Sequence, residues 1–106
     1  MRGDSKFGNI PSRVNGRFFA SKREARRYQE LLLLERAGVI RDLETQPVFD
    51  LDVNGIHVAK YLADFRYYDT ERNTLVVEDS KGVRTETYKL KARLMKAVHG
   101  IEVEEV

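Results

Sequence analysis

The sequence contains no cysteine among its 106 residues. Disulfides, thiolate metal ligands and cysteine nucleophiles are therefore excluded, and the absence fits a reducing cytosol. The two histidines, His57 and His99, lack the spacing of a metal triad, and we expect both at the surface. No apolar run approaches the ~20 residues of a membrane span, and the first residues carry charge, so we expect neither a membrane partner nor a signal peptide.

The formal net charge is only +2, because basic and acidic segments offset one another. Residues 1–41 contain ten Lys/Arg and four Asp/Glu, residues 42–80 three and nine, and residues 81–106 six and four. Basic ends around an acidic middle suit a protein that attracts a polyanion and gathers carboxylates at one place. Chance clustering of solvated charges explains the pattern equally well.

The length allows one domain at most. Hydrophobic residues make up 42% of the chain and charged residues 34%, which is typical of a globular protein. Residues 1–16 contain three glycines, one proline and several basic side chains. We therefore expect a basic flexible arm at 1–16 and a single domain at 17–106.

Two helices are predicted. Ser21 to Glu24 has the S-x-x-E form of a capping box, and the helix that it begins runs to about Ala37, before Gly38. A second helix covers about 86–98. The expected apolar positions are Ala25, Tyr28, Leu31, Leu32 and Leu34 in the first helix, and Tyr88, Leu90, Leu94, Met95 and Val98 in the second.

Four strands are expected, at about 42–52, 56–69, 75–80 and 101–104. Pro47 marks the first as an edge strand, and Asn54-Gly55 predicts a two-residue hairpin turn after it. The order is α-β-β-β-α-β, an α/β fold with a mixed sheet flanked by helices. The third strand, second helix and last strand would form one right-handed crossover.

Two acidic residues and a lysine are expected close together. Asp64 is placed in the second strand, and Asp79-Ser80-Lys81 ends the third. Side chains two apart in a strand share a face, so Asp79 and Lys81 point the same way. Neighbouring carboxylates repel unless a cation or proton separates them, and such hard oxygen ligands suit Mg²⁺ or Mn²⁺. Lys81 could then hold an attacking water or neutralise charge on a phosphoryl group.

Each of these residues also has a purely structural interpretation. Asp64 could pair with Arg66 or Lys60, and Asp79 could belong to a turn. Glu24 could serve only as the capping partner of Ser21. Glu78 is expected to point away from its neighbour Asp79 and to pair with a basic residue. The combination is more specific than its parts: a helix glutamate, a strand aspartate, then D-x-K and a basic helix.

This combination resembles the PD-(D/E)XK nuclease superfamily, whose core is α-β-β-β-α-β, over about residues 17–105. More closely, four runs resemble a family of small phage and prophage proteins first catalogued as a domain of unknown function. The runs are FASKREARRY at 19–28, LETQP at 43–47, YLADF at 61–65 and VEDSKG at 77–82. The chain is also similar to phage Holliday-junction resolvases and to the endonuclease subunit of some transposases.

The resemblance implies a restriction-endonuclease-like core and a catalytic set comprising Glu24, Asp64, Asp79 and Lys81. It implies metal ligation by Asp64, Asp79, the Ser80 carbonyl and Glu24, and it places Gln46 near the substrate path. Two departures from the superfamily pattern stand out: Ala63 replaces the usual proline before Asp64, and Ser80 replaces the more usual apolar residue.

The resemblance further implies a Mg²⁺- or Mn²⁺-dependent endodeoxyribonuclease in the cytoplasm of a bacterial host, encoded by a phage or prophage. Its DNA could be branched or a recombination intermediate. The alternative is a catalytically silent nucleic-acid- or protein-binding module on the same fold. The candidate phosphate contacts are Arg23, Arg26, Arg27, Lys89 and Lys91, which could equally form ordinary solvated helix faces.

A homodimer is also expected as a possible partner state. Leu31 to Leu34 are four consecutive leucines, and a helix packed on one side of a sheet cannot bury all four in its own core. Leu33 could therefore meet a second copy, or it could pack under the N-terminal arm.

Overall fold

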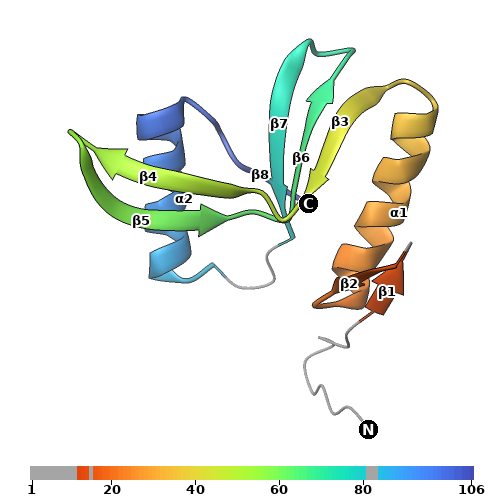
Figure 1. Ribbon diagram of the computed structural model, residues 1–106, viewed down its shortest axis with the longest axis horizontal. Helices are drawn as coiled ribbons and strands as arrows, with labels where there is room; N and C mark the ends of the chain where they lie inside the picture. The colour runs from red at the N-terminus through yellow and green to blue at the C-terminus, as the bar shows by residue number, and fades with distance from the viewer. Residues whose placement is uncertain (1–11, 15, 81–83) are drawn as a thin grey trace, which may run out of the picture. The chain divides into compact units, whose positions relative to one another are not determined.

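The structure is a computed structural model that describes residues 12–14, 16–80 and 84–106 (Figure 1). The chain divides into two compact units, Met1–Val39 and Ile40–Val106. Both expected helices and a mixed sheet are present, so the chain is a mixed α/β protein. The single domain expected at 17–106 spans parts of both units. That these residues form one domain stays a prediction.

The first unit consists of a short hairpin and a helix. Strands β1 (Ser12–Val14) and β2 (Arg17–Phe19) pair antiparallel, and helix α1 (Lys22–Arg36) follows them. The rings of Phe19 and Tyr28 lie 4.9 Å apart between centroids, which ties the hairpin to the helix. The stretch expected to be a flexible arm therefore includes a paired strand, because β1 falls inside it; residues 1–11 lie outside the described residues.

The helix α1 begins and ends as its sequence predicts. The Ser21 hydroxyl accepts a hydrogen bond from the Glu24 backbone N–H at 3.2 Å, which caps the first turn. The expected apolar face is present, with Ala25, Tyr28 and Leu31 buried. Leu33 is 63% exposed, so the leucine run does leave one side chain outside the core of this unit.

The second unit contains a four-stranded mixed sheet. Its members are β3 (Ile40–Thr45), β6 (Phe65–Asp69), β7 (Thr74–Asp79) and β8 (Glu104–Glu105), in the order β3-β6-β7-β8. The first two pairings are antiparallel, and β7 pairs with β8 in parallel. The last strand is shorter and later than the expected 101–104, because only two residues reach the register of β7.

A separate two-stranded ribbon projects from the same unit. Strands β4 (Val48–Val53) and β5 (Ile56–Leu62) pair antiparallel through the predicted Asn54-Gly55 turn. Both turn residues have positive φ, 52° and 79°, which glycine and asparagine tolerate best and which suits the twist of a hairpin. This turn prediction is confirmed.

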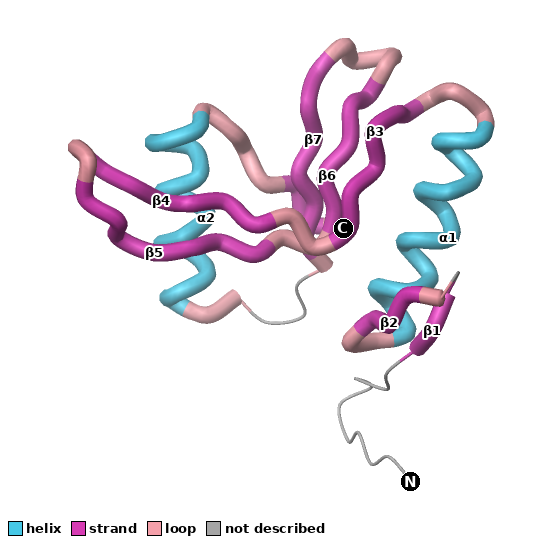
Figure 2. The backbone as a smooth tube through the Cα atoms, viewed as in Figure 1, coloured by secondary structure: helices cyan, strands magenta, loops and turns pink. Residues whose placement is uncertain are grey.

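Two strands predicted as continuous are each broken in two. The expected strand 42–52 becomes β3 and β4, and the expected strand 56–69 becomes β5 and β6. Gln46 has a φ of 53°, and Pro47 has no N–H to donate, so the ladder bends here. Two backbone bonds hold the bend, from Gln46 N–H to the Asp64 carbonyl at 2.8 Å and from Ala63 N–H to the Pro47 carbonyl at 3.1 Å. Figure 2 shows both breaks as short loops.

Helix α2 (Glu86–His99) contacts both strands of the ribbon and connects the parallel strands β7 and β8. The Thr85 hydroxyl caps it by accepting from the Tyr88 N–H at 3.0 Å, and Gly100 ends it with a φ of 69°. Leu90, expected on the apolar face, is 54% exposed, because the face of α2 that packs on the core includes Tyr88, Ala92 and Met95 instead. The buried residues of this core are Phe49, Leu51, Tyr61, Ala63, Val77, Tyr88 and Met95. No helix in the described part of the chain is long and apolar enough to cross a membrane.

Candidate active site

Asp79 is the last residue of β7, and its side chain is completely buried. Its Oδ1 accepts a hydrogen bond from the Asp64 backbone N–H at 3.1 Å, and its Oδ2 accepts one from the Tyr61 hydroxyl. The Val106 N–H donates to its backbone carbonyl at 3.0 Å. Strands β7 and β8 and the β5–β6 break therefore all converge on this one residue.

Asp64 lies in the break between β5 and β6, whereas the sequence placed it within a strand. Its Oδ2 accepts a hydrogen bond from the Ser80 backbone N–H at 2.6 Å. Its own N–H points at Asp79, so each aspartate bonds a backbone group at or next to the other. The structure thus brings Asp64, Asp79 and Ser80 together, as the sequence predicted, with the backbone of Gln46 beside them.

The chemical type of the oxygen atoms gathered here suits a hard divalent cation. An ionised carboxylate oxygen has two lone pairs, so it can accept a hydrogen bond and coordinate a cation at the same time. Carboxylate and carbonyl oxygens are the ligands that Mg²⁺ and Mn²⁺ prefer. The buried Ser80 hydroxyl has no hydrogen-bond partner within the described residues. These same residues contain no group of three or more Asp, Glu or His positioned to hold a metal ion.

Two members of the predicted catalytic set are not placed with the aspartates. Glu24 belongs to the first unit, where it is buried in the first turn of α1, and its role at a metal stays a prediction. Lys81 lies outside the described residues. The pair Asp64–Asp79 is therefore the part of the predicted set with a described geometry.

The predicted phosphate contacts lie on both helices. Arg23 and Arg26 are exposed on α1, and Arg27 forms an ion pair with Glu30 at 2.9 Å. On α2, Lys89 pairs with Glu86 at 3.1 Å. Their contact with DNA stays a prediction.

Lys91 is half-buried and lines a pocket of about 220 Å³. The other residues around this pocket are Tyr61, Leu62, Thr85, Thr87 and Tyr88. Tyr61 also bonds Asp79, so this tyrosine belongs both to the pocket lining and to the candidate site.

Sequence reasoning missed the tyrosines that bind the buried carboxylates. Glu78, expected to pair with a basic residue, is almost fully buried, and its Oε2 accepts a hydrogen bond from the Tyr67 hydroxyl. Both faces of β7 are buried at this point, so a hydrogen-bond donor held in the core offsets the cost of burying this polar group. The tyrosines could only be counted as sheet residues, since pairing across strands depends on register.

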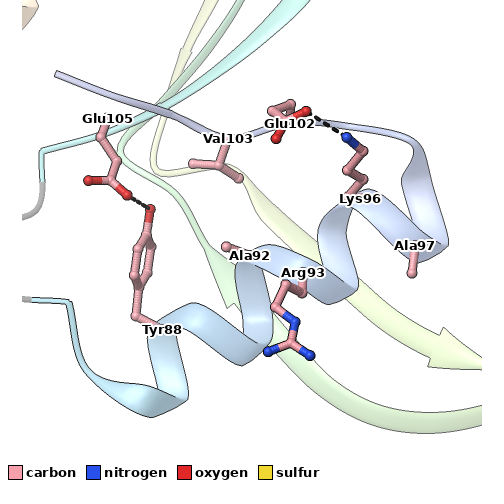
Figure 3. Close-up of a pocket in the computed structure, with 8 residues that line it drawn as sticks. All are labelled: Tyr88, Ala92, Arg93, Lys96, Ala97, Glu102, Val103 and Glu105. Atoms are coloured by element: carbon pink, nitrogen blue, oxygen red, sulfur yellow. Dashed lines mark hydrogen bonds and ion pairs between the residues drawn. The ribbon is translucent and has the colours of Figure 1, made fainter.

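A third pair lies at the C-terminal end of the chain. Figure 3 shows the Tyr88 hydroxyl directed from α2 towards Glu105, at 3.3 Å from its Oε2, with the Lys96–Glu102 ion pair at 2.8 Å on the same pocket rim. The pocket has a volume of about 370 Å³. Burial, and then the charges of Glu105 and Asp79, raise the pKa of Tyr88 to about 12. This tyrosine therefore keeps its proton at neutral pH and loses it only near pH 12.

The two histidines are exposed, as predicted. His57 Nδ1 lies 2.7 Å from Asp52 Oδ1, and His99 Nε2 lies 2.8 Å from the Asp50 carbonyl. Both contacts belong to the ribbon and its neighbouring helix end, and neither histidine joins the candidate site.

Comparison with known proteins identifies the family of this chain. No curated protein and no solved structure matches the chain. A family model matches residues 4–102, which is nearly the whole sequence. The chain therefore belongs to the family described as a protein of unknown function, DUF1064.

Proposed function

We propose that this protein is a Mg²⁺- or Mn²⁺-dependent endonuclease of the PD-(D/E)XK type that hydrolyses phosphodiester bonds in DNA. The observation that supports the proposal is the meeting of Asp64, Asp79 and Ser80 at the end of β7. Asp79 is buried and Asp64 is half-buried. Neighbouring carboxylates in such a place are costly to keep ionised, and a bound cation would offset that cost. The mixed sheet with a parallel β7–β8 pair is compatible with the restriction-endonuclease-like core.

In the proposed reaction, each of the predicted site residues has a separate role. Asp64 and Asp79 would hold the cation, together with the Ser80 carbonyl and Glu24. When bound, the cation would lower the pKa of a water molecule and offset negative charge on the phosphate. Lys81 would orient the attacking water or stabilise the charge that develops on the phosphoryl oxygens. Arg23, Arg26, Arg27, Lys89 and Lys91 would bind the flanking phosphates, with Gln46 near the substrate path.

The proposed setting is the cytoplasm of a bacterial host that carries a phage or prophage. The proposed substrates include branched DNA and recombination intermediates. The basic balance of the first 41 residues supports attraction to a polyanion.

The test is a cleavage assay on plasmid DNA and on a four-way DNA junction, with Mn²⁺, with Mg²⁺ or with EDTA. We expect metal-dependent products from the wild type and none from Asp79→Asn. Asp52→Asn is the matched control, because it also removes one carboxylate charge but from an exposed position on the ribbon. Equal cleavage by wild type and Asp79→Asn would refute the assignment of the site.

A second function has one observation in its favour. Asp79 is fully enclosed, and both of its oxygens already accept hydrogen bonds. An aspartate that only joins strands would look the same, as in a catalytically silent module that binds nucleic acid or protein. DNA retention without any cleavage in the same assay would favour this module over the enzyme.

A further inference from the structure

We propose that Tyr61 is a positioning residue, whose hydroxyl holds the Asp79 carboxylate in the orientation that binds the divalent cation. This inference rests on the proposed function. It assigns a role to a residue that neither the D-x-K motif nor the basic helices include. The contact is direct, from the Tyr61 hydroxyl to Asp79 Oδ2.

The tyrosine is held rigidly enough to fix its partner. Tyr61 lies on β5, is 3% exposed and belongs to the core that joins the ribbon to α2. Its ring centroid is 6.3 Å from that of Tyr88, at an interplanar angle of 42°. A tyrosine side chain has only two torsions, χ1 and χ2. When its ring is packed in this way, the position of its hydroxyl oxygen is fixed.

The carboxylate has little freedom once both contacts are made. The Asp64 N–H holds Oδ1 from one strand break, and the Tyr61 hydroxyl holds Oδ2 from the ribbon. A carboxylate oxygen that accepts one hydrogen bond can coordinate a cation through its second lone pair. Hydrogen bonds that orient a metal-binding carboxylate contribute to metal affinity. The carboxylate is already ordered before the metal binds, so binding loses less conformational entropy.

The chain provides its own controls. Tyr67 donates to Glu78 and Tyr88 donates to Glu105, and neither of these glutamates is a predicted metal ligand. Tyr67→Phe and Tyr88→Phe therefore remove the same kind of hydrogen bond from a buried ring, but the lost bond is not one to Asp79. A purely structural role for Tyr61 would make all three phenylalanine variants behave alike.

The experiment measures Mn²⁺ binding to the full chain by isothermal titration calorimetry, with thermal unfolding in EDTA measured alongside. We expect Tyr61→Phe to raise the Mn²⁺ dissociation constant roughly 10-fold, the usual scale for losing a partner of a metal ligand. Tyr67→Phe and Tyr88→Phe should stay within about twofold of wild type in affinity, although all three should unfold at lower temperature. DNA cleavage by Tyr61→Phe should be restored by raising the Mn²⁺ concentration.

The outcomes separate this inference from the function on which it depends. Wild-type protein that binds no Mn²⁺ would overturn both. Wild-type binding with an unchanged constant in Tyr61→Phe, or an equal loss in all three variants, would overturn the role of Tyr61 alone.

A measurement on wild-type protein covers the case in which Tyr61→Phe does not fold. The protein is labelled with 3-fluorotyrosine and titrated with Mg²⁺ while its fluorine spectrum is recorded. We expect the Tyr61 resonance to shift most, and a spectrum unchanged at saturating Mg²⁺ would overturn the proposal.

Discussion

The Asp64 backbone N–H points at Asp79 Oδ1, 3.1 Å away, and the Ser80 N–H returns a hydrogen bond of 2.6 Å to Asp64 Oδ2. The two aspartates therefore stabilise the fold at the point where the proposed chemistry occurs. We therefore expect substitutions here to change stability together with the proposed activity, and the choice of replacement to decide which effect is larger.

Asp79→Ala should be less stable than Asp79→Asn by about 1–3 kcal/mol, the cost of leaving one buried polar group unpaired. Alanine leaves the buried Tyr61 hydroxyl without its acceptor, whereas asparagine keeps an oxygen for the Asp64 N–H and an amide that can donate to the phenol oxygen. Denaturant unfolding in EDTA measures the difference. Adding Tyr61→Phe to the alanine variant should recover part of the loss, and a double variant with fully additive losses would contradict this account.

Lys81→Ala should lower the cleavage rate by roughly 100-fold or more, with little loss of DNA binding, if the ammonium acts on the developing charge. Single-turnover cleavage and filter binding on the same substrate separate the two quantities. Lys96→Ala is the matched control, since Lys96 is not among the proposed phosphate contacts and pairs with Glu102 at 2.8 Å. Equal losses of binding and turnover in Lys81→Ala would identify Lys81 as a phosphate anchor instead.

Lys91→Gln should weaken DNA binding and reduce the slope of log affinity against log salt by about 1, the value for one lost phosphate contact. Its half-buried side chain lines the pocket beside Tyr61. The control is Lys96→Gln, because Lys96 pairs with Glu102 at 2.8 Å on another part of α2. Binding measured at several salt concentrations decides it, and an unchanged slope in Lys91→Gln would remove Lys91 from the DNA interface.

The free energy of unfolding should fall as the pH rises from about 10 to 12, in part through Tyr88. Its pKa is raised in the folded protein to about 12, first by burial and then by the charges of Glu105 and Asp79. The phenol ionises near pH 10 in the unfolded chain. Between pH 10 and 12 the unfolded state therefore loses this proton while the folded state keeps it, which favours unfolding. Tyr88→Phe should show a shallower fall than wild type by denaturant unfolding at each pH. If the free energy of unfolding falls with pH equally in both proteins, Tyr88 does not contribute to this pH dependence.

Leu33→Glu should convert a dimer to a monomer without loss of fold, if the exposed leucine meets its symmetry mate. Leu33 is 63% exposed at the surface of α1, and two-fold pairs are the commonest soluble oligomers. Light scattering at micromolar concentration gives the mass, and circular dichroism checks the fold. Gln29→Glu is the control, since it adds the same charge at another exposed position of the helix. A wild type that is already monomeric rules the dimer out.

Local signals in the sequence were sufficient for the helices and the turn. Ser21 and Thr85 begin the two helices as caps, and Asn54-Gly55 forms the hairpin turn, because each depends on backbone geometry within a few residues. The expectation that Asp64 lies beside Asp79-Ser80 is also met in the structure, since the short β6–β7 turn brings the two segments together.

Tertiary structure alone decided how those residues are held. The break at Gln46-Pro47 and Ala63-Asp64 turns one expected hairpin into two sheets and takes Asp64 out of a regular strand. The tyrosine partners of Asp79, Glu78 and Glu105 follow from register and from packing between distant strands. The sequence by itself determined which residues are candidates for the proposed chemistry, because residue type and local spacing can be read from it directly. Which side chain faces which carboxylate was decided only in the fold, because a shift of one residue in strand register moves every side chain to the opposite face.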